Sequence, residues 1–235
     1  MAGEAVVDFG SFRVITFDCY GTLVDWEPGV AAVLRPLLAE HGVMAREREL
    51  LQAFSEFERS ARRGPWVAFR EILSQVVQRV GERFGFQVTA SERDVLAQSI
   101  RFWPLFPDTT SVLRRLKRRY LLGIISNIDD ELFELTRPQL GVDLDLLVTA
   151  EQAHAYKPEL APFHLALERL GLPRREWLHV AQSVSHDIIP ARQLGVPCVR
   201  ITRRGTRFGE PPPVGVAADL ELPDLNALAE YAGVV

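Results

Sequence analysis

The stretch that decides the fold lies near the beginning of the chain and runs Phe12-Arg13-Val14-Ile15-Thr16-Phe17-Asp18-Cys19-Tyr20-Gly21-Thr22-Leu23. Residues 12–17 are rich in β-branched and aromatic types, which predicts a buried strand. Gly21 predicts a turn directly after that strand. Asp18 is therefore expected at the carboxyl end of a strand, facing the crevice where open α/β sheets bind ligands. A charge placed there needs compensation, which makes Asp18 a candidate functional residue.

The composition is that of a globular protein. The 235 residues include 47% hydrophobic and 25% charged types, and the net charge is −4. Such a balance supports a proper core and argues against a nucleic-acid partner, which would require a basic surface. No run reaches about 18 consecutive apolar residues, so we expect no membrane-spanning segment. The acidic start of the chain lacks a signal-peptide pattern, so we expect a cytoplasmic protein.

The two cysteines, Cys19 and Cys198, each lie in or beside an apolar run. This placement predicts two small buried hydrophobic residues in a reducing compartment. Cys19 adjoins Asp18, so a thiol nucleophile has to be weighed. Because side chains alternate between faces along a strand, Cys19 is expected to point away from the pocket that Asp18 faces.

Strand and helix patterns alternate along most of the chain. Strand patterns cover residues 12–17, 121–126 and 196–201, with a shorter one at 178–181, and helical patterns cover 110–119, 130–140, 162–170 and 188–194. This alternation predicts an α/β fold with a doubly wound parallel sheet. The densest proline cluster, Pro211-Pro212-Pro213, predicts a rigid surface loop.

Residues 29–103 interrupt the alternation, because they contain no convincing strand. Amphipathic helices are predicted at 30–41, 46–62, 66–84 and 91–102, where apolar residues recur at three- and four-residue steps. We therefore expect a core made of residues 1–28 and 104–235, with a helical insert of residues 29–103. The insert could be a lid over the crevice or one more helical layer of the core.

Polar side chains fall at four places where the sheet is expected to end: Asp18, the pair Ser126 and Asn127, Lys157 after a short segment at 146–155, and Asp187. In a parallel sheet these strand ends meet at one edge. A carboxylate such as Asp18 can attack carbon or phosphorus and form an ester, and Lys157 would keep it ionised. Ser126 and Asn127 can donate hydrogen bonds to a substrate carboxylate or phosphate. Asp187 could position Lys157 or activate the water that cleaves the ester.

Taken in order, four segments resemble the motifs of the haloacid dehalogenase superfamily: Phe17-Asp18-Cys19-Tyr20-Gly21-Thr22-Leu23, Ser126-Asn127, Tyr156-Lys157-Pro158, and the segment around Asp187. The helical insert sits where that superfamily carries its cap. The resemblance implies a Rossmann-like core, a helical cap after the first strand and an Asp18 nucleophile. It implies catalytic roles for Asp18, Lys157 and Asp187, and substrate contacts from Tyr20, Thr22, Ser126, Asn127, Ser183 and His186.

The residue two positions after the nucleophile separates branches of that superfamily. Its phosphatases carry an Asp there to protonate a departing alkoxide, whereas a halide needs no proton. Here the position is Tyr20, and a phenol with a pKa of about 10 is a poor substitute for a carboxylic acid. Residues 20–25 also resemble the L-2-haloacid dehalogenases. Alternatively, Tyr20 is a packing residue and another acid supplies the proton.

The resemblance also bears on metal use. The phosphatases bind Mg²⁺ through the nucleophile and acidic residues of the last motif, where the usual Gly-Asp-Ser is here Ala181-Gln182-Ser183. With one acid missing and Lys157 supplying positive charge, we expect no required metal or cofactor. A weak Mg²⁺ site on Asp18 and Asp187 stays open.

Three positions depart from the haloacid dehalogenases. The place of their cap arginine falls near Leu50, Phe163 replaces a tyrosine, and Val184 replaces an asparagine, for which Ser183, Ser185 or His186 could compensate. Arginines near Leu50 are Arg46, Arg48, Arg59, Arg62, Arg63 and Arg70. Candidates for an apolar pocket wall, more often core residues, are Trp26, Trp66, Phe102 and Trp103.

We therefore expect a hydrolase that acts at carbon of a small carboxylate substrate, in the manner of a 2-haloacid dehalogenase. The alternatives are a Mg²⁺-dependent phosphatase, a related hydrolase of the C–N bond in a small cyclic amino acid, and a binding protein that has lost the chemistry. The apolar helices of the insert could support a homodimer.

Overall fold

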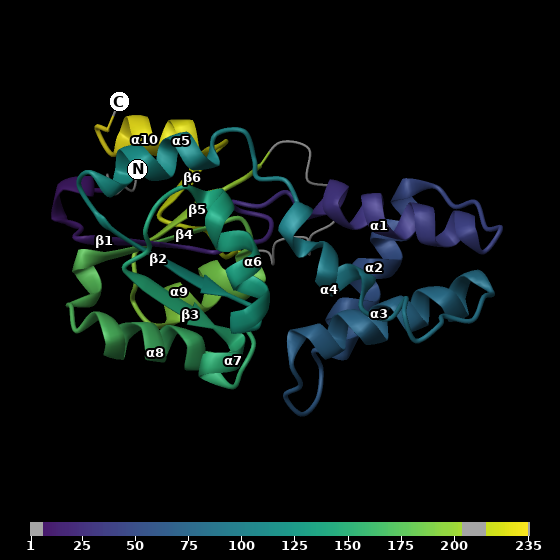
Figure 1. Ribbon diagram of the computed structural model, residues 1–235. Helices are drawn as coiled ribbons and strands as arrows, with labels where there is room; N and C mark the ends of the chain where they lie inside the picture. Colours follow the sequence, from purple (N-terminus) through teal and green to yellow (C-terminus); the bar gives the residue numbers. More distant parts are fainter. Residues whose placement is uncertain (1–6, 204–214, 235) are drawn as a thin grey trace.

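A parallel β-sheet forms the centre of the computed structural model, which describes residues 7–203 and 215–234. The sheet has six strands in the order β3-β2-β1-β4-β5-β6. Their bounds are β1 Val14–Phe17, β2 Leu121–Ser126, β3 Leu146–Thr149, β4 Trp177–Ala181, β5 Cys198–Ile201 and β6 Leu220–Leu222. Helices α5 (Thr109–Lys117) and α10 (Leu225–Tyr231) cover one face, and α8 (Ala161–Leu170) covers the other (Figure 1). The predicted doubly wound α/β fold is confirmed.

Strand β1 is central, which explains its sequence. It pairs in parallel with β2 on one side and β4 on the other, and all four of its residues are buried. A parallel strand covered on both faces needs apolar residues at nearly every position rather than an alternating pattern. Asp18 follows β1 immediately, so its carboxylate lies at the carboxyl edge of the sheet.

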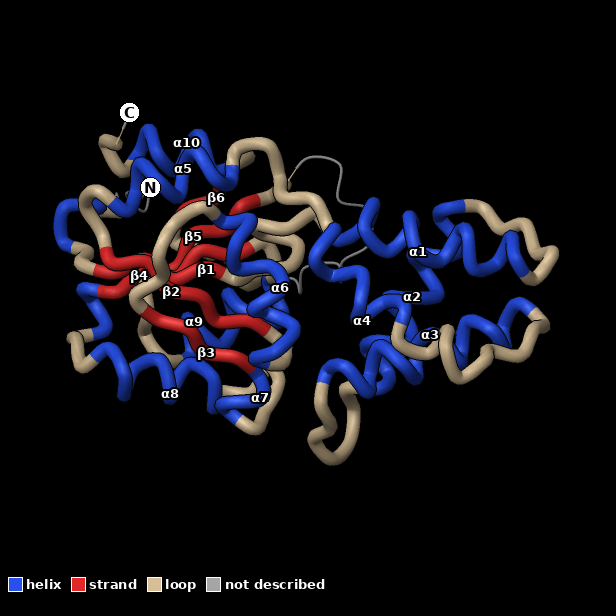
Figure 2. Tube along the Cα trace, in the orientation of Figure 1, coloured by secondary structure: helices blue, strands red, loops and turns tan. Residues whose placement is uncertain are grey.

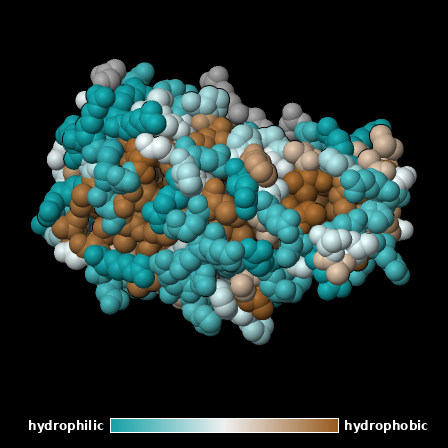
Figure 3. Space-filling view, in the orientation of Figure 1, coloured by the Kyte–Doolittle hydropathy of each residue, from teal (hydrophilic) through white to brown (hydrophobic). Residues whose placement is uncertain are grey.

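Four helices lie beside the carboxyl edge of the sheet, separated in sequence by no strand (Figure 2). They are α1 (Trp26–Glu40), α2 (Glu47–Ala61), α3 (Phe69–Phe84) and α4 (Val95–Ser99). Leu50, Leu51, Phe54 and Phe57 of α2 are buried at the helical spacing that the sequence predicts. Figure 3 shows hydrophobic residues gathered over α2, between α1 and α3.

Several element boundaries differ from the predicted ones. Strand β6 and helix α10 were not predicted, and residues 146–155 resolve into β3 and α7 (Ala150–Ala153). A three-residue edge strand is too short to show periodicity, which is why β6 escapes a sequence pattern. The predicted strands 12–17 and 196–201 begin later, at Val14 and Cys198.

Two predicted helices are also shorter or less regular. Residues 91–94 form turns before α4, which passes into a 3₁₀ turn at Ile100–Phe102. The helix predicted at 188–194 is α9 (Ile189–Gln193), preceded by a π-helical turn at Val184–Ile188. Helix α6 (Asp130–Leu140) has the predicted bounds. Residues 211–213 lie outside the described residues. No helix of the described chain combines the length and apolar character needed to cross a bilayer.

Candidate active site

Lys157 joins two carboxylates at the carboxyl edge of the sheet. Its Nζ lies 2.9 Å from Oδ1 of Asp18 and 2.5 Å from Oδ1 of Asp187, and it donates to the Ile125 carbonyl at 2.8 Å. Asp18 follows β1, Asp187 lies in the π-helical turn after β4, and Lys157 follows α7. All three side chains are buried. The structure thus brings together the three residues to which the sequence assigns catalytic roles.

The turn after β1 holds the second oxygen of Asp18. Thr22 Oγ1 donates to Asp18 Oδ2 at 2.7 Å and accepts from the Gln182 backbone N–H at 2.9 Å. Gly21 has a φ of +99°, a conformation that side chains rarely adopt, which lets Thr22 return toward Asp18. Thr22 is fully buried and is absent from the cavity lining of the described residues. Thr22 therefore bonds the Asp18 carboxylate itself, and the substrate contact that the resemblance implies for it stays a prediction.

Ser126 ends β2 and Asn127 follows it, and the two side chains have different hydrogen-bond partners. The Asn127 amide accepts from the Lys157 backbone N–H at 2.7 Å and donates to the Lys157 carbonyl at 3.0 Å. This two-way contact fixes the backbone that carries the lysine. Ser126 Oγ is buried and has no hydrogen-bond partner among the described residues. A buried hydroxyl without a partner is costly, so Ser126 is available to a bound substrate.

The charges in this cluster depend on one another. Burial alone would lower the pKa of Lys157, but Asp18 and Asp187 outweigh it and raise that pKa above its ordinary value. Burial opposes ionisation of Asp187, yet Lys157 and a hydrogen bond from His179 lower its pKa to about 2. Burial raises the pKa of Asp18, against the opposing effect of Lys157. The cluster therefore consists of one ammonium between two carboxylates, of which Asp18 is the more readily protonated.

A cavity of about 160 Å³ opens over these groups. The predicted residues that line it are Asp18, Tyr20, Ser126, Asn127, Lys157, Ser183, His186 and Asp187. Ser183 Oγ lies 3.2 Å from Nδ1 of His186. Val184, where a dehalogenase has asparagine, also lines the cavity. Phe163, which replaces the tyrosine, is fully buried with its ring 5.0 Å from that of His179.

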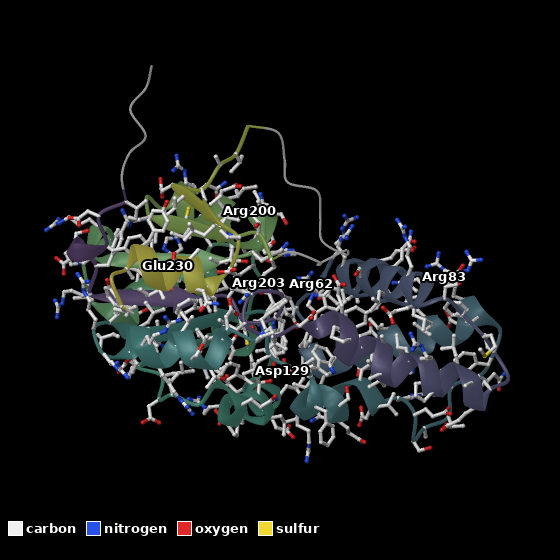
Figure 4. The ribbon with its side chains drawn as sticks, turned by 90° about the horizontal axis from the view of Figure 1, so that it is seen from above. Arg62, Arg83, Asp129, Arg200, Arg203 and Glu230 are labelled. Atoms are coloured by element: carbon white, nitrogen blue, oxygen red, sulfur yellow. The ribbon has the colours of Figure 1, made fainter. Side chains whose placement is uncertain are left out.

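Helices α1, α2 and α3 supply the opposite wall. Of the six arginines near Leu50, Arg59 and Arg62 line the cavity, whereas Leu50 is fully buried. Arg62 Nε lies 2.8 Å from Oε1 of Glu58. Figure 4 labels Arg62 where these helices meet the sheet, and Arg200 on the sheet side. Lining residues to which the sequence assigned no place in the site are Phe54, Ser55, Glu58, Phe69 and Arg200.

Two of the four aromatic candidates form part of the wall. Trp26 lines the cavity and stacks on Phe54 with ring centroids 5.3 Å apart, and Trp103 meets the Tyr20 ring edge-on at 5.7 Å. Trp66 instead packs on His154, and Phe102 is 77% exposed. The apolar part of the pocket therefore comes mainly from α1 and α2 and from the segment after α4.

Tyr20 presents its ring to the cavity and directs its hydroxyl elsewhere. The phenol oxygen lies 2.8 Å from Thr136 Oγ1 of α6, and burial raises the pKa of Tyr20 well above its ordinary value. A weaker acid whose hydroxyl already has a partner is a poor proton donor to a leaving group. Tyr20 therefore acts as a wall of the pocket in this geometry.

Both cysteines are free and buried, as predicted. Burial raises the pKa of Cys19 well above its ordinary value, and the nearby Asp18 charge adds to this rise. Cys19 is absent from the described lining of the cavity. A buried thiol with a raised pKa is a poor nucleophile.

The donor set offers few unbonded oxygen ligands for a magnesium ion. Mg²⁺ prefers several oxygen ligands, whereas here the Lys157 ammonium already bonds both carboxylates. Position 182 carries an amide in place of the family's acid. Among residues 7–203 and 215–234, no group of three or more His, Cys, Asp or Glu side chains is arranged to hold a metal. The positive charge at this site is supplied by the lysine.

An α/β sheet with an Asp–Lys–Asp cluster at its carboxyl edge and helices across it defines a class of hydrolases. The model of the haloacid dehalogenase-like hydrolase family matches residues 12–195. The chain belongs to this family and is an enzyme.

Curated relatives come from two branches of the family. The chain is 30% identical over 210 residues to a phosphoglycolate phosphatase of Yersinia pestis, covering 87% of each protein. It is 26% identical over 223 residues to (S)-2-haloacid dehalogenase H-109 of Pseudomonas putida, covering 92% of this chain and 96% of the relative. A crystal structure of an L-2-haloacid dehalogenase superimposes with a TM-score of 0.81 at 25% identity, covering 95% of this chain and 100% of that one.

Proposed function

We propose that the protein is a metal-independent hydrolase that displaces a leaving group from carbon 2 of a small 2-substituted acid, as 2-haloacid dehalogenases do. The observation that carries this proposal is the Lys157 ammonium bonded to both Asp18 and Asp187, together with a Tyr20 hydroxyl bonded to Thr136. The first supplies a nucleophile and its counter-charge. The Tyr20 hydroxyl, which is bonded to Thr136, leaves no acid at the position where a phosphatase protonates its leaving group. Similarity to the haloacid dehalogenases supports the same choice.

In the first half of the reaction, a carboxylate oxygen of Asp18 attacks carbon 2 of the substrate. The carbon–halogen bond breaks, the halide leaves with the bonding electrons, and an ester forms between Asp18 and the substrate. Ser126 Oγ, which is buried without a partner among the described residues, donates to the substrate carboxylate. Arg59 and Arg62 bring positive charge to the cavity wall that receives the halide.

In the second half, water attacks the carboxyl carbon of Asp18. Asp187 Oδ2 is buried in the cavity wall with no hydrogen-bond partner among the described residues, so it is the oxygen open to a water proton. The tetrahedral intermediate collapses, and the oxygen on carbon 2 leaves with the proton that Asp187 took from water, which gives the 2-hydroxy acid. Asp18, whose carboxyl group now contains one oxygen from water, loses its remaining proton to solvent. Lys157 stays bonded to both carboxylates and stabilises the negative charge that returns to Asp18.

We further propose that residues 29–103 form a cap domain on the core of residues 1–28 and 104–235. Residues of α1, α2 and α3 close the cavity opposite Asp18, so opening between these helices and the sheet would admit the substrate. We also propose that the protein forms a homodimer through the apolar residues over α2. Light scattering, which measures the mass of the particle in solution, checks this proposal. Two buried free cysteines support a cytoplasmic location.

The proposal is tested by incubating the enzyme with each enantiomer of 2-chloropropionate and measuring chloride release with and without a chelator. We expect release that the chelator does not affect. No chloride from any member of a panel of halogenated acids, alongside Mg²⁺-dependent cleavage of phosphoglycolate or an aryl phosphate, would contradict it.

Similarity to phosphoglycolate phosphatase supports the second candidate, a Mg²⁺-dependent phosphatase. A third candidate is cleavage of a C–N bond in a small cyclic amino acid. Asp18 would again attack carbon, but the leaving amine would need a proton, for which His186 in the cavity wall is the available group. Amino-acid release from such a substrate, with no chloride from haloacids, would favour it.

A further inference from the structure

A chain of hydrogen bonds runs from the active site into the core behind it. His179, in the middle of β4, is fully buried, and its Nε2 lies 3.0 Å from Oδ1 of Asp187. Its Nδ1 lies 2.8 Å from Oγ1 of Thr16, which accepts from Trp177 Nε1 at 2.6 Å. Thr16 and His179 face one another across the β1–β4 pair in register. The sequence motifs assigned none of these three residues to the site.

The bonding partners fix where each proton lies. An indole N–H can only donate, so Thr16 Oγ1 is the acceptor from Trp177. The Thr16 hydroxyl hydrogen is then directed to Nδ1 of His179, which must be unprotonated to accept it. The remaining proton of a neutral imidazole is on Nε2, where it is donated to Asp187. This arrangement satisfies every donor in the chain.

These hydrogen bonds make the two carboxylate oxygens of Asp187 different from one another. Oδ1 receives hydrogen bonds from both Lys157 and His179. Oδ2 is buried and has no partner among the described residues, and Asp187 is one of the residues that line the cavity. The two donors therefore fix the rotation of the carboxylate and leave its second oxygen unbonded at the cavity.

We propose that His179 is a positioning residue for hydrolysis of the Asp18 ester: donating from Nε2 to Oδ1 of Asp187, it keeps Oδ2 aimed at the attacking water. This inference rests on the proposed function, because it assigns His179 to the second half of that reaction. Displacement of the halide uses Asp18 and needs no base, so loss of His179 acts on ester hydrolysis far more than on ester formation.

If His179 served only to pack the core, an apolar residue would fill the same space at a lower free-energy cost of burial. A buried polar side chain is tolerated only when it is fully bonded, and three such groups in series are used here to place one proton. The ring of Phe163 closes the side of the imidazole edge-on at 5.0 Å and offers no polar atom. The imidazole therefore directs its hydrogen bonding to Thr16 and Asp187.

The test compares His179→Leu, which removes the donor, with His179→Gln, which keeps an N–H at the position of Nε2. Enzyme and 2-chloropropionate are mixed rapidly, quenched, and analysed for chloride and for the mass of the Asp18 peptide. His179→Leu is expected to release about one chloride per enzyme in a burst, accumulate the ester and turn over at least about tenfold more slowly. His179→Gln is expected to recover most of the steady rate.

Thr16 provides a second pair of variants that leaves His179 in place. Thr16→Val removes the hydroxyl that selects the Nε2 proton, and Thr16→Ser retains it. We expect ester to accumulate in Thr16→Val and not in Thr16→Ser. In the wild-type enzyme, ¹⁵N NMR of the His179 ring is expected to find the proton on Nε2, which checks the assignment without any turnover.

The outcomes separate the two proposals. Equal slowing of the first chloride release and of steady turnover in His179→Leu, or a proton on Nδ1, would overturn the role of His179, while ester on the Asp18 peptide of the quenched enzyme would still support the proposed function. Failure of the wild-type enzyme to form ester or chloride with any haloacid would instead overturn the proposed function.

Discussion

Lys157 has no hydrogen left for a substrate. An ammonium has three donors, and in this site they go to Asp18, Asp187 and the Ile125 carbonyl. Its backbone is held on both sides by the Asn127 amide. The lysine therefore serves as a fixed positive charge, and recognition of the substrate has to come from other groups, such as Ser126.

The pKa values of the two carboxylates shift in opposite directions, and this predicts how the activity falls in acid. Burial raises the pKa of Asp18 above its ordinary value, whereas Lys157 and His179 outweigh burial and lower that of Asp187 to about 2. As the pH falls, Asp18 is protonated first and loses its nucleophilicity while Asp187 is still ionised. We expect kcat/KM for chloride release to fall with a midpoint above the ordinary pKa of an aspartate. Full activity below that ordinary pKa would contradict a raised pKa of Asp18.

Tyr20 offers a substitution that separates packing from acid catalysis. Tyr20→Phe keeps the ring against Trp103 and removes the hydrogen bond to Thr136, so we expect a loss of about 1 kcal/mol in stability. Chloride release should stay within a few-fold of wild type, because the hydroxyl does not face the reaction. Thr136→Val removes the same hydrogen bond from the other side and is the matched control. A hundredfold loss of kcat confined to Tyr20→Phe would show that the phenol is a catalytic acid.

At the scale of elements, the helices and the sheet are joined at the beginning of α3. The Asp129 carboxylate, in the loop after β2, accepts from the backbone N–H groups of Phe69 and Arg70 at 2.7 Å each. Tyr156, next to Lys157, donates its hydroxyl to the Val67 carbonyl at 2.8 Å. Asp129 is buried, so a residue of the core caps a helix of the opposite wall. Figure 4 labels Asp129 at this junction.

Removing that cap should loosen the wall that closes the cavity. We expect Asp129→Ala to cost about 1–2 kcal/mol of stability and to raise KM for the haloacid more than it lowers kcat. The control is Glu131→Ala, which removes a contact at 3.1 Å from the same Arg70, at a side chain that is 79% exposed. Differential scanning calorimetry and steady-state kinetics check the pair. An unchanged KM in Asp129→Ala would mean that this junction does not govern closure.

Elements with long, uniform patterns could be predicted from the sequence, and short ones could not. Helix α6 has its predicted bounds because its apolar spacing and flanking Asp129 and Gly141 all agree. Strand β6 has three residues, and the helix expected from 188 is preceded by a π-helical turn that carries Asp187. A π-helical turn leaves no signature in hydrophobic spacing, because it displaces the chain by a single residue.

At the scale of the whole molecule, some residues of the site could be predicted from the sequence, whereas others reach the site only through contacts between distant elements. Asp18, Ser126 and Asp187 end or follow strand patterns, so their meeting at one edge follows from parallel topology, whereas α7 separates Lys157 from β3. Arg62 and Glu58 reach the cavity only because α2 lies across that edge, and His179 reaches Asp187 only because a turn brings residue 187 back over β4. Contacts between distant elements leave no pattern in a single sequence.

The proposed reaction requires a covalent bond between the substrate and Asp18. A single turnover of 2-chloropropionate in ¹⁸O-water, with enzyme in excess, followed by mass spectrometry of the Asp18 peptide and of the product, tests it directly. We predict one ¹⁸O atom in Asp18 and an unlabelled hydroxyl in the 2-hydroxy acid, because water attacks the carboxyl carbon of the ester. Label in the product hydroxyl and none in Asp18 would mean that water attacks the substrate itself, and would contradict the mechanism.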